Sequence, residues 1–168
     1  RLGIHSRALA APVRPRDVVL GEALTYLGLA LMQSVLIVGA GALVFGVDWG
    51  DPLGAAALVA VWALVGTGAG MLSGTVFRTP EQASSIGPAI GIALGMLGGT
   101  MWPLEIVGPT MRRIGHLSPH AWAVDGWVEL LSRGGGLADI ALQLAVLAVF
   151  AVALLGLATV RLRRRLTV

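Results

Sequence analysis

The sequence predicts an all-α integral membrane protein with four transmembrane helices, both ends on the cytoplasmic side, and an extracellular helical hairpin, amphipathic or re-entrant, before the last helix. The first observation is composition. Of the 168 residues, 56% are hydrophobic and 12% are charged, whereas a soluble domain carries about 25% charged residues. The second is the presence of four long apolar runs. The third is that glycines recur every four residues along two of these runs.

Residues 1–17 precede the first apolar run and are rich in Arg. They hold four of the twelve Arg in the chain, and Pro12 and Pro15 interrupt any helix there. Positive charge beside an apolar run is typical of the cytoplasmic side of a membrane. We expect a cytoplasmic segment, either a solvated stretch beside the membrane or a short amphipathic docking helix.

The first predicted transmembrane helix covers residues 18–45. This run exceeds the roughly 20 residues that a bilayer requires, with Glu22 near its cytoplasmic end and Gln33 near its middle. Amide side chains in membrane helices commonly bond a neighbouring helix. We therefore expect Gln33 to form an interhelical hydrogen bond rather than to contact a substrate. The short acidic turn that follows contains Trp49, as expected at the outer interface.

Two glycine ridges distinguish the second and third predicted transmembrane helices, residues 53–77 and 83–102. Glycines four residues apart lie along one side of a helix. Without side chains, such a ridge lets another backbone approach closely, which favours helix association in lipid. We expect the ridges to pack helices, with the lining of a translocation route as the alternative. They comprise Gly66, Gly70 and Gly74 in the second helix and Gly87, Gly91, Gly95 and Gly99 in the third.

The long connection of residues 103–139 is predicted to form the extracellular hairpin. Val107, Met111 and Ile114 share one helical face, and a second apolar face follows Pro119. Two short amphipathic helices with interleaved Trp are typical of a segment in the headgroup region or one that dips back into the bilayer. The residues that we assign to this hairpin are Trp102, Pro103, Glu105, Pro119, Trp122 and Trp127.

The last predicted transmembrane helix covers residues 140–160, and a cytoplasmic Arg-rich tail, residues 161–168, follows it. Nine of the twelve Arg lie in the N-terminal segment, the turn at Arg78 and this tail, whereas the two connections on the opposite side hold three. Cytoplasmic loops are enriched in Lys and Arg. This asymmetry predicts a multi-pass protein of the plasma (inner) membrane with both ends of the chain in the cytoplasm.

The sequence shows no catalytic, cofactor-binding or metal-binding residues. It contains no Lys, which excludes a P-loop, and no Cys, which excludes thiolate chemistry. His116 and His120 are four residues apart, but Pro119 interrupts the turn and no carboxylate completes a metal-ligand set. The net charge of +3 comes from clusters at helix ends, so we expect no nucleic-acid partner.

Ionisable side chains inside a membrane span are the usual sign of an ion-coupled carrier. The interiors of the second, third and fourth predicted helices contain none. Glu105, Asp125 and Glu129 are candidates for acid/base chemistry, yet all three fall in the predicted hairpin. We expect them to be surface residues or to structure the hairpin, where the spacing of Glu129 and Arg133 favours an ion pair.

Four stretches of the sequence follow one another in a characteristic order. They are Ala11-Pro12-Val13 ahead of Gly21-Glu22, Arg78-Thr79-Pro80-Glu81-Gln82-Ala83, Gly98-Gly99-Thr100-Met101-Trp102-Pro103-Leu104-Glu105, and His116-Leu117-Ser118-Pro119-His120-Ala121-Trp122-Ala123. Their order and spacing resemble those in the membrane subunit of an ABC-2-type exporter, the permease partner of an ATP-binding-cassette (ABC) ATPase. The chain resembles the branch that exports drugs and ions, including bacterial multidrug exporters, more than the glycan exporters.

The resemblance implies a subunit of six spans, of which this chain would hold the third to the sixth. It thus implies that two N-terminal spans precede this chain. The start at Arg1 rather than Met fits the expectation that the chain is a fragment of a longer protein. The resemblance also implies that residues 1–12 end a coupling helix that contacts the ATPase. The residues assigned to this contact are Leu2, Ser6, Arg7 and Leu9.

The implied function is that of a permease that forms the substrate route across the membrane. A separate ABC ATPase would hydrolyse ATP with Mg²⁺, so this chain would bind no cofactor itself and would not be an enzyme. The other implied partners are a second permease subunit, identical or different, and membrane lipids. The alternatives are a non-transporting scaffold or assembly protein and a membrane-bound lipid-modifying enzyme that uses Glu105, Asp125 or His120.

Overall fold

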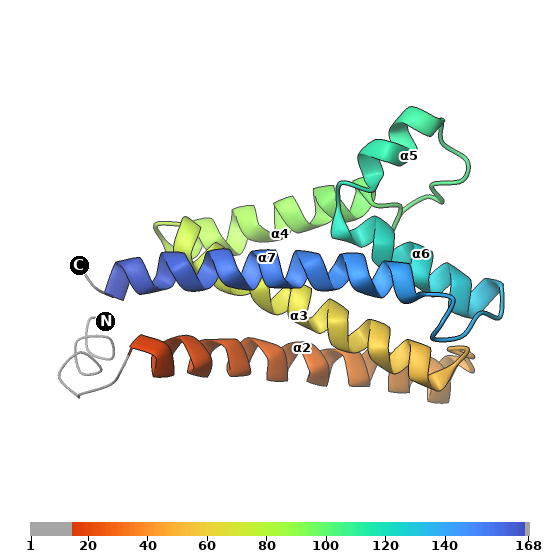
Figure 1. Ribbon diagram of the computed structural model, residues 1–168, viewed down its shortest axis with the longest axis horizontal. Helices are drawn as coiled ribbons and strands as arrows, with labels where there is room; N and C mark the ends of the chain where they lie inside the picture. Colours follow the sequence, from red (N-terminus) through yellow and green to blue (C-terminus); the bar gives the residue numbers. More distant parts are fainter. Residues whose placement is uncertain (1–14, 167–168) are drawn as a thin grey trace.

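The computed structural model describes residues 15–166, which form six helices and no strand. Figure 1 shows long helices aligned with one axis and a short helical hairpin at one end. The hairpin consists of α5 and α6 and stands between α4 and α7 in the chain. The helices are α2 (Pro15–Phe45), α3 (Pro52–Val76), α4 (Pro80–Leu97), α5 (Pro109–Gly115), α6 (Pro119–Ser132) and α7 (Ala141–Leu166).

The central helix of this arrangement is α3. It packs along α7 over most of its length and also contacts α2, whereas α4 diverges from the bundle and meets it mainly near α6 (Figure 1). The largest apolar core lies where α3, α6 and α7 meet. Its fully buried side chains include Leu58, Leu130 and Leu147. The hairpin is therefore anchored to the membrane helices by α6.

Proline and a capping side chain together set where four of the helices begin. The helices α3, α4, α5 and α6 each have Pro at their start, where the missing N–H costs no hydrogen bond and the fixed φ suits the first turn. Asp51, Thr79 and Ser118 precede three of these prolines, and each accepts a hydrogen bond from a backbone N–H of the first turn.

Asp51 joins two connections at the hairpin end of the bundle. Its Oδ2 atom accepts hydrogen bonds from the backbone N–H of Gly54, at 2.8 Å, and from that of Leu137, at 3.0 Å. Trp49, two residues earlier, packs edge-to-face on Trp127 of α6 with ring centroids 5.3 Å apart. The α2–α3 turn is thus attached both to α6 and to the connection that follows it.

Three helices in the described part of the chain are long and apolar enough to cross a membrane. They confirm the predicted apolar helices of residues 18–45, 53–77 and 140–160. In each case the structure shows a helix over the predicted range, apart from a few residues at the ends. The three segments that are long and apolar enough are Asp17–Phe45, Pro52–Val76 and Ala141–Arg164.

The helix α4 differs from the predicted third span, residues 83–102. It is 18 residues long, starts with Pro80-Glu81-Gln82 and ends at Leu97. With this polar start it is not among the three helices that are both long and apolar enough to cross a membrane. The prediction that helix continues to Trp102 was wrong, because Gly98 ends α4 and Gly99 turns the chain with φ +88°. Crossing of the membrane by α4 stays a prediction.

The last helix extends farther than predicted. It continues through Leu166 rather than ending at residue 160, so most of the predicted tail of residues 161–168 is helical. Within residues 103–139 the two predicted short helices are present as α5 and α6. Leu104 is 3% exposed, and it fills the space beside Gly99 and Gly115, a contact that the periodicity of this segment did not indicate.

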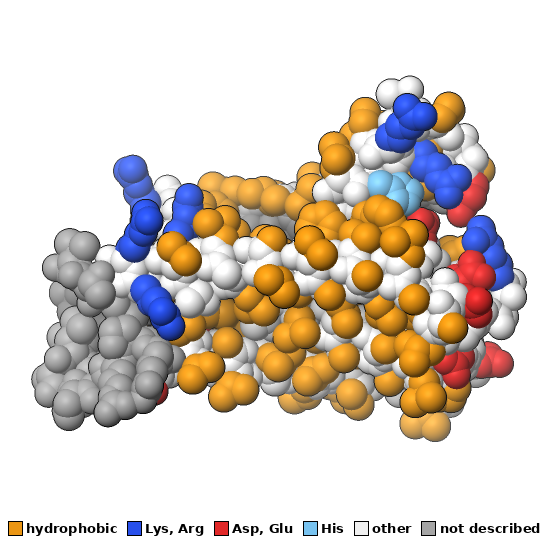
Figure 2. Space-filling model, viewed as in Figure 1, with side chains coloured by type: hydrophobic (Ala, Val, Ile, Leu, Met, Phe, Trp, Pro, Cys, Tyr) orange, Lys and Arg blue, Asp and Glu red, His pale blue; other side chains and the backbone are white. Residues whose placement is uncertain are grey.

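Charged side chains gather at the two ends of the bundle, and apolar side chains cover the flank between them (Figure 2). Arg161, Arg163 and Arg164 lie near the end of α7, which is the bundle end that also carries the α3–α4 turn with Arg78 (Figure 1). Acidic side chains gather at the opposite end (Figure 2). An apolar belt between polar ends is the surface that a bilayer requires.

Candidate functional site

A groove of about 550 Å³ lies between α3 and α4. Helix α7 contributes Phe150 and Leu154 to it, and the start of α6 contributes Pro119 and His120. Pockets of this size are typical of small-molecule sites. The lining is almost entirely apolar. It comprises Trp62, Val65, Gly66, Ala69, Leu72, Ser73 and Val76 from α3, Phe77 directly after α3, and Gly87, Ile90, Gly91 and Leu94 from α4.

Three glycines of the two predicted ridges face this groove rather than another backbone. At Gly66, Gly74 and Gly91 an added Cβ atom would meet no heavy atom within 4 Å, and at Gly87 only the Phe77 ring at 3.9 Å. Gly66, Gly87 and Gly91 line the groove directly. The absence of side chains therefore opens space between α3 and α4. The use of these glycines in transport stays a prediction.

Three of the predicted ridge residues have other surroundings. An added Cβ at Gly70 would lie 3.2 Å from the ring of Tyr26 on α2, so this glycine does serve helix packing. At Gly95 it would lie 3.2 Å from Thr100 Oγ1. Gly99 is not on a helix at all, because it lies in the turn after α4.

Two glycines that the four-residue spacing does not single out permit close approaches between helices. An added Cβ at Gly68 would lie 2.7 Å from Leu154 Cβ and 3.0 Å from the backbone nitrogen of Leu155, both on α7. One at Gly98 would lie 2.7 Å from the backbone nitrogen of Ala121 on α6. Gly68 stands between Gly66 and Gly70 in sequence, and no local signal distinguishes it from them.

Gln33 is exposed on α2 and does not line the groove. Within the described residues it makes no hydrogen bond to another helix, so the predicted interhelical bond is not formed inside this part of the chain. The assigned coupling residues lie outside the described residues, and the structure gives no account of them. They are Leu2, Ser6, Arg7 and Leu9.

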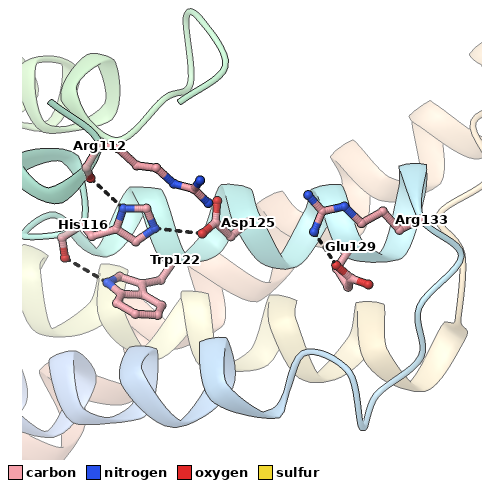
Figure 3. Close-up of polar contacts among 6 residues, drawn as sticks. All are labelled: Arg112, His116, Trp122, Asp125, Glu129 and Arg133. Atoms are coloured by element: carbon pink, nitrogen blue, oxygen red, sulfur yellow. Dashed lines mark hydrogen bonds and ion pairs between the residues drawn. The ribbon is translucent and has the colours of Figure 1, made fainter. Parts of the chain in front are cut away.

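The hairpin is held together by a polar network around His116 (Figure 3). The Nε2 atom of His116 lies 2.8 Å from Asp125 Oδ2, and Nδ1 lies 2.8 Å from the carbonyl oxygen of Arg112. Trp122 Nε1 donates to the carbonyl oxygen of His116 at 2.9 Å. Both ring nitrogens of His116 thus lie within hydrogen-bond distance of an oxygen atom. These bonds join α5 to α6.

Glu129 and Arg133 form the predicted ion pair, with Glu129 Oε2 2.8 Å from Arg133 Nη1 (Figure 3). The hydrogen bond to Glu129 raises the pKa of Arg133, and the negative charge of the carboxylate adds to the effect. Asp125 and Glu129 are thus engaged in contacts that structure the hairpin, whereas Glu105 is exposed. In the described part of the chain no three His, Asp or Glu side chains gather to hold a metal ion.

The predicted hairpin residues do not share one environment. Trp102, Pro103 and Glu105 are exposed, and they belong to the irregular segment between α4 and α5. Pro119 starts α6 and lines the groove. Trp122 and Trp127 are half-buried, packed against His116 and Trp49 respectively.

His120 is the polar side chain at the hairpin end of the groove. Its Nδ1 atom lies 3.0 Å from Ser118 Oγ, and its ring packs edge-to-face on Trp62 with ring centroids 5.0 Å apart. Ser118 Oγ in turn donates to the carbonyl oxygen of Leu94 on α4 at 3.1 Å. Burial lowers the pKa of His120, which favours the neutral imidazole. Ser118 thereby connects α6 to α4.

The chain is similar to known membrane proteins. A family model described as ABC-2 type transporter matches residues 1–131. The linearmycin resistance permease protein LnrN of Bacillus subtilis (strain 168) is 30% identical over 149 residues, which are 89% of this chain and 39% of that protein. No solved structure matches.

The family match covers more than half of the chain, and the helices between polar ends are those of a multi-pass membrane protein. The permease resemblance that was drawn from the four sequence stretches is confirmed. This chain spans 39% of the length of the matched permease. It belongs to the ABC-2 type transporter family as part of a transmembrane ABC transporter permease.

Proposed function

We propose that this chain forms part of the substrate route of an ABC exporter that removes apolar or amphipathic compounds, including drugs, from the cell. Family membership supports the transporter role, and the observation that carries the route is the open groove between α3 and α4. The name of the matched relative, a linearmycin resistance permease, supports export of a toxic compound.

Energy would come from a separate ABC ATPase that binds ATP and Mg²⁺. The sequence contains no Lys and therefore no P-loop of its own. The ATPase would act on the coupling segment of residues 1–12, and a second permease subunit would complete the transporter in the plasma membrane. The Arg residues at the end of α7, together with Arg78 in the α3–α4 turn, support a cytoplasmic location for that side of the bundle.

A cross-linking experiment on the full-length protein that contains this chain tests the proposal. The 168 residues contain no Cys, so a single Ser6→Cys substitution gives one reactive thiol within this part of the protein. We expect a short thiol-to-amine reagent to join position 6 to an ABC ATPase in native membranes, and the yield to change when ATP is added. Cysteine at exposed Ser132, in the hairpin, is the matched control and should not cross-link to the ATPase.

Two other results would favour the alternative functions, a scaffold and a lipid-modifying enzyme. Labelling of position 6 from outside the cell, with no ATPase attached, would contradict both the topology and the transporter role and would favour a scaffold. Activity on lipids by purified protein without an ATPase, lost on Ala substitution of Glu105, Asp125 or His120, would favour the enzyme alternative.

A further inference from the structure

The groove between α3 and α4 has one polar end. Along its length the walls are apolar side chains and bare glycine backbone, and the hydroxyl of Ser73, which lines it, already donates to the carbonyl oxygen of Gly70 at 2.8 Å. At the hairpin end the groove reaches His120. At the other end it reaches Phe77, one residue before the Arg78 turn. The groove thus extends from the hairpin end of the bundle toward the end that carries Arg78.

The contacts of Ser118 favour one tautomer of His120. Ser118 Oγ donates its single proton to the carbonyl oxygen of Leu94 at 3.1 Å. In that arrangement it accepts from His120, and it lies 3.2 Å from the backbone nitrogen and 3.0 Å from Nδ1. We therefore assign the hydrogen to Nδ1, which leaves Nε2 of the neutral ring as a bare acceptor.

Within the described residues the Nε2 atom of His120 has no hydrogen-bond partner, and it is not fully buried. Because His120 lines the groove, this atom is available to a ligand bound there. The ring is held in place by Ser118 on one edge and by Trp62, whose ring centroid is 5.0 Å away. An unpaired acceptor beside apolar surface favours a ligand that supplies a donor.

From this geometry we infer that the groove binds an elongated apolar molecule bearing a hydroxyl or N–H donor, with the donor on His120 Nε2 and the apolar chain extended between α3 and α4 toward Phe77. This inference rests on the proposed function in taking the bound molecule as cargo. Gly66 and Gly91 would contact the chain directly, because nothing within 4 Å fills the space above either of them. The ligand class is therefore set by one acceptor and a long apolar wall.

A matched pair of photoreactive probes tests the inference on the full-length protein. One probe is a saturated long-chain primary alcohol with a diazirine in mid-chain, and the other is its methyl ether, which lacks only the donor. The protein is placed in phosphatidylcholine vesicles, whose lipid carries no hydroxyl or N–H group. We expect the alcohol to label α3 and α4 about fivefold more than the ether, as one net hydrogen bond would give.

Two substitutions separate the acceptor from the shape of the ring. The amide oxygen of His120→Gln reaches the position of Nε2, whereas the shorter side chain of His120→Asn reaches only that of Nδ1. We expect His120→Gln to retain the preference for the alcohol and His120→Asn to label equally with both probes. Equal labelling of the unsubstituted protein by both probes, or the same preference in both variants, would overturn the inference.

The probe comparison needs no substitution, so it remains decisive if a variant fails to fold. ATP-dependent movement of the probes in vesicles that also contain the ATPase is measured separately. ATP-dependent movement without a preference for the alcohol would contradict the inference and leave the proposed function standing. A preference for the alcohol without ATP-dependent movement would contradict the proposed function and support the binding site alone.

Discussion

Glycine plays two opposite roles in this chain, and the difference depends on what lies opposite each residue. At Gly68 the backbone of α7 occupies the space that a side chain would need. At Gly66 and Gly91 that space is open and belongs to the groove. The same residue type thus lets one pair of helices pack closely and leaves open space between another pair.

Leucine at these positions is expected to have different effects. Gly68→Leu forces α3 away from α7 and should destabilise the protein by about 1–3 kcal/mol, as overpacking does. Gly91→Leu projects into the groove and should leave the folded state intact while removing ATP-dependent export. Thermal unfolding in detergent, together with flux in vesicles, measures both effects. Equal stability of the two variants would contradict the assignment of Gly68 to packing.

The hairpin is the element that the polar contacts specify most closely. His116 lies at the end of α5, and Asp125 lies on α6, with side chains that are 19% and 22% exposed. The pair therefore lies in partly desolvated surroundings, where a hydrogen bond is stronger than in water. Glu129 and Arg133 join two turns of one helix, and Arg133 is 59% exposed, so their contact is expected to matter less.

Substitution of Asp125 should therefore loosen the hairpin. We expect Asp125→Asn to destabilise the protein by about 1–2 kcal/mol, and His116→Ala to add little once Asp125 has been changed. Glu129→Gln serves as the control and should leave the thermal midpoint unchanged. A double-mutant cycle read by thermal unfolding measures the coupling. Additive effects of the His116 and Asp125 substitutions would contradict a direct contact.

Sequence reasoning was most successful for the elements whose signal is local. Apolar length predicts α2, α3 and α7, and the helical face before Pro119 predicts a hairpin of two short helices. The end of α4 was missed because the turn depends on the backbone conformation of Gly99, whose spacing also fits a helix. The groove was missed because it requires knowing that α4 diverges from α3, and the role of Gly68 because it depends on α7.

At the scale of the whole molecule, the apolar belt and the Arg-rich end define how the bundle would sit in a membrane. The end that carries the α3–α4 turn and the last residues of α7 is basic, and the hairpin is at the other end (Figures 1 and 2). Helix α4 connects the two ends. Its crossing of the membrane is therefore the step on which the sidedness of the hairpin depends.

Single cysteines at two exposed serines test that crossing. Ser84 lies near the start of α4, and Ser132 ends α6. In intact cells we expect a membrane-impermeant thiol reagent to label Ser132→Cys, and to label Ser84→Cys only after the membrane is permeabilised. Labelling of both positions in intact cells would show that α4 does not cross.

The double hydrogen bond of Asp51 has a consequence for the order of events during synthesis. One partner, Gly54, follows within three residues, whereas the other, Leu137, lies 86 residues farther along the chain. A ribosome has therefore already released the chain for α3, α4, α5 and α6 before the second bond becomes possible. This contact can join the α2–α3 turn to the connection before α7 only after Leu137 has been synthesised, so it forms later than the bond to Gly54.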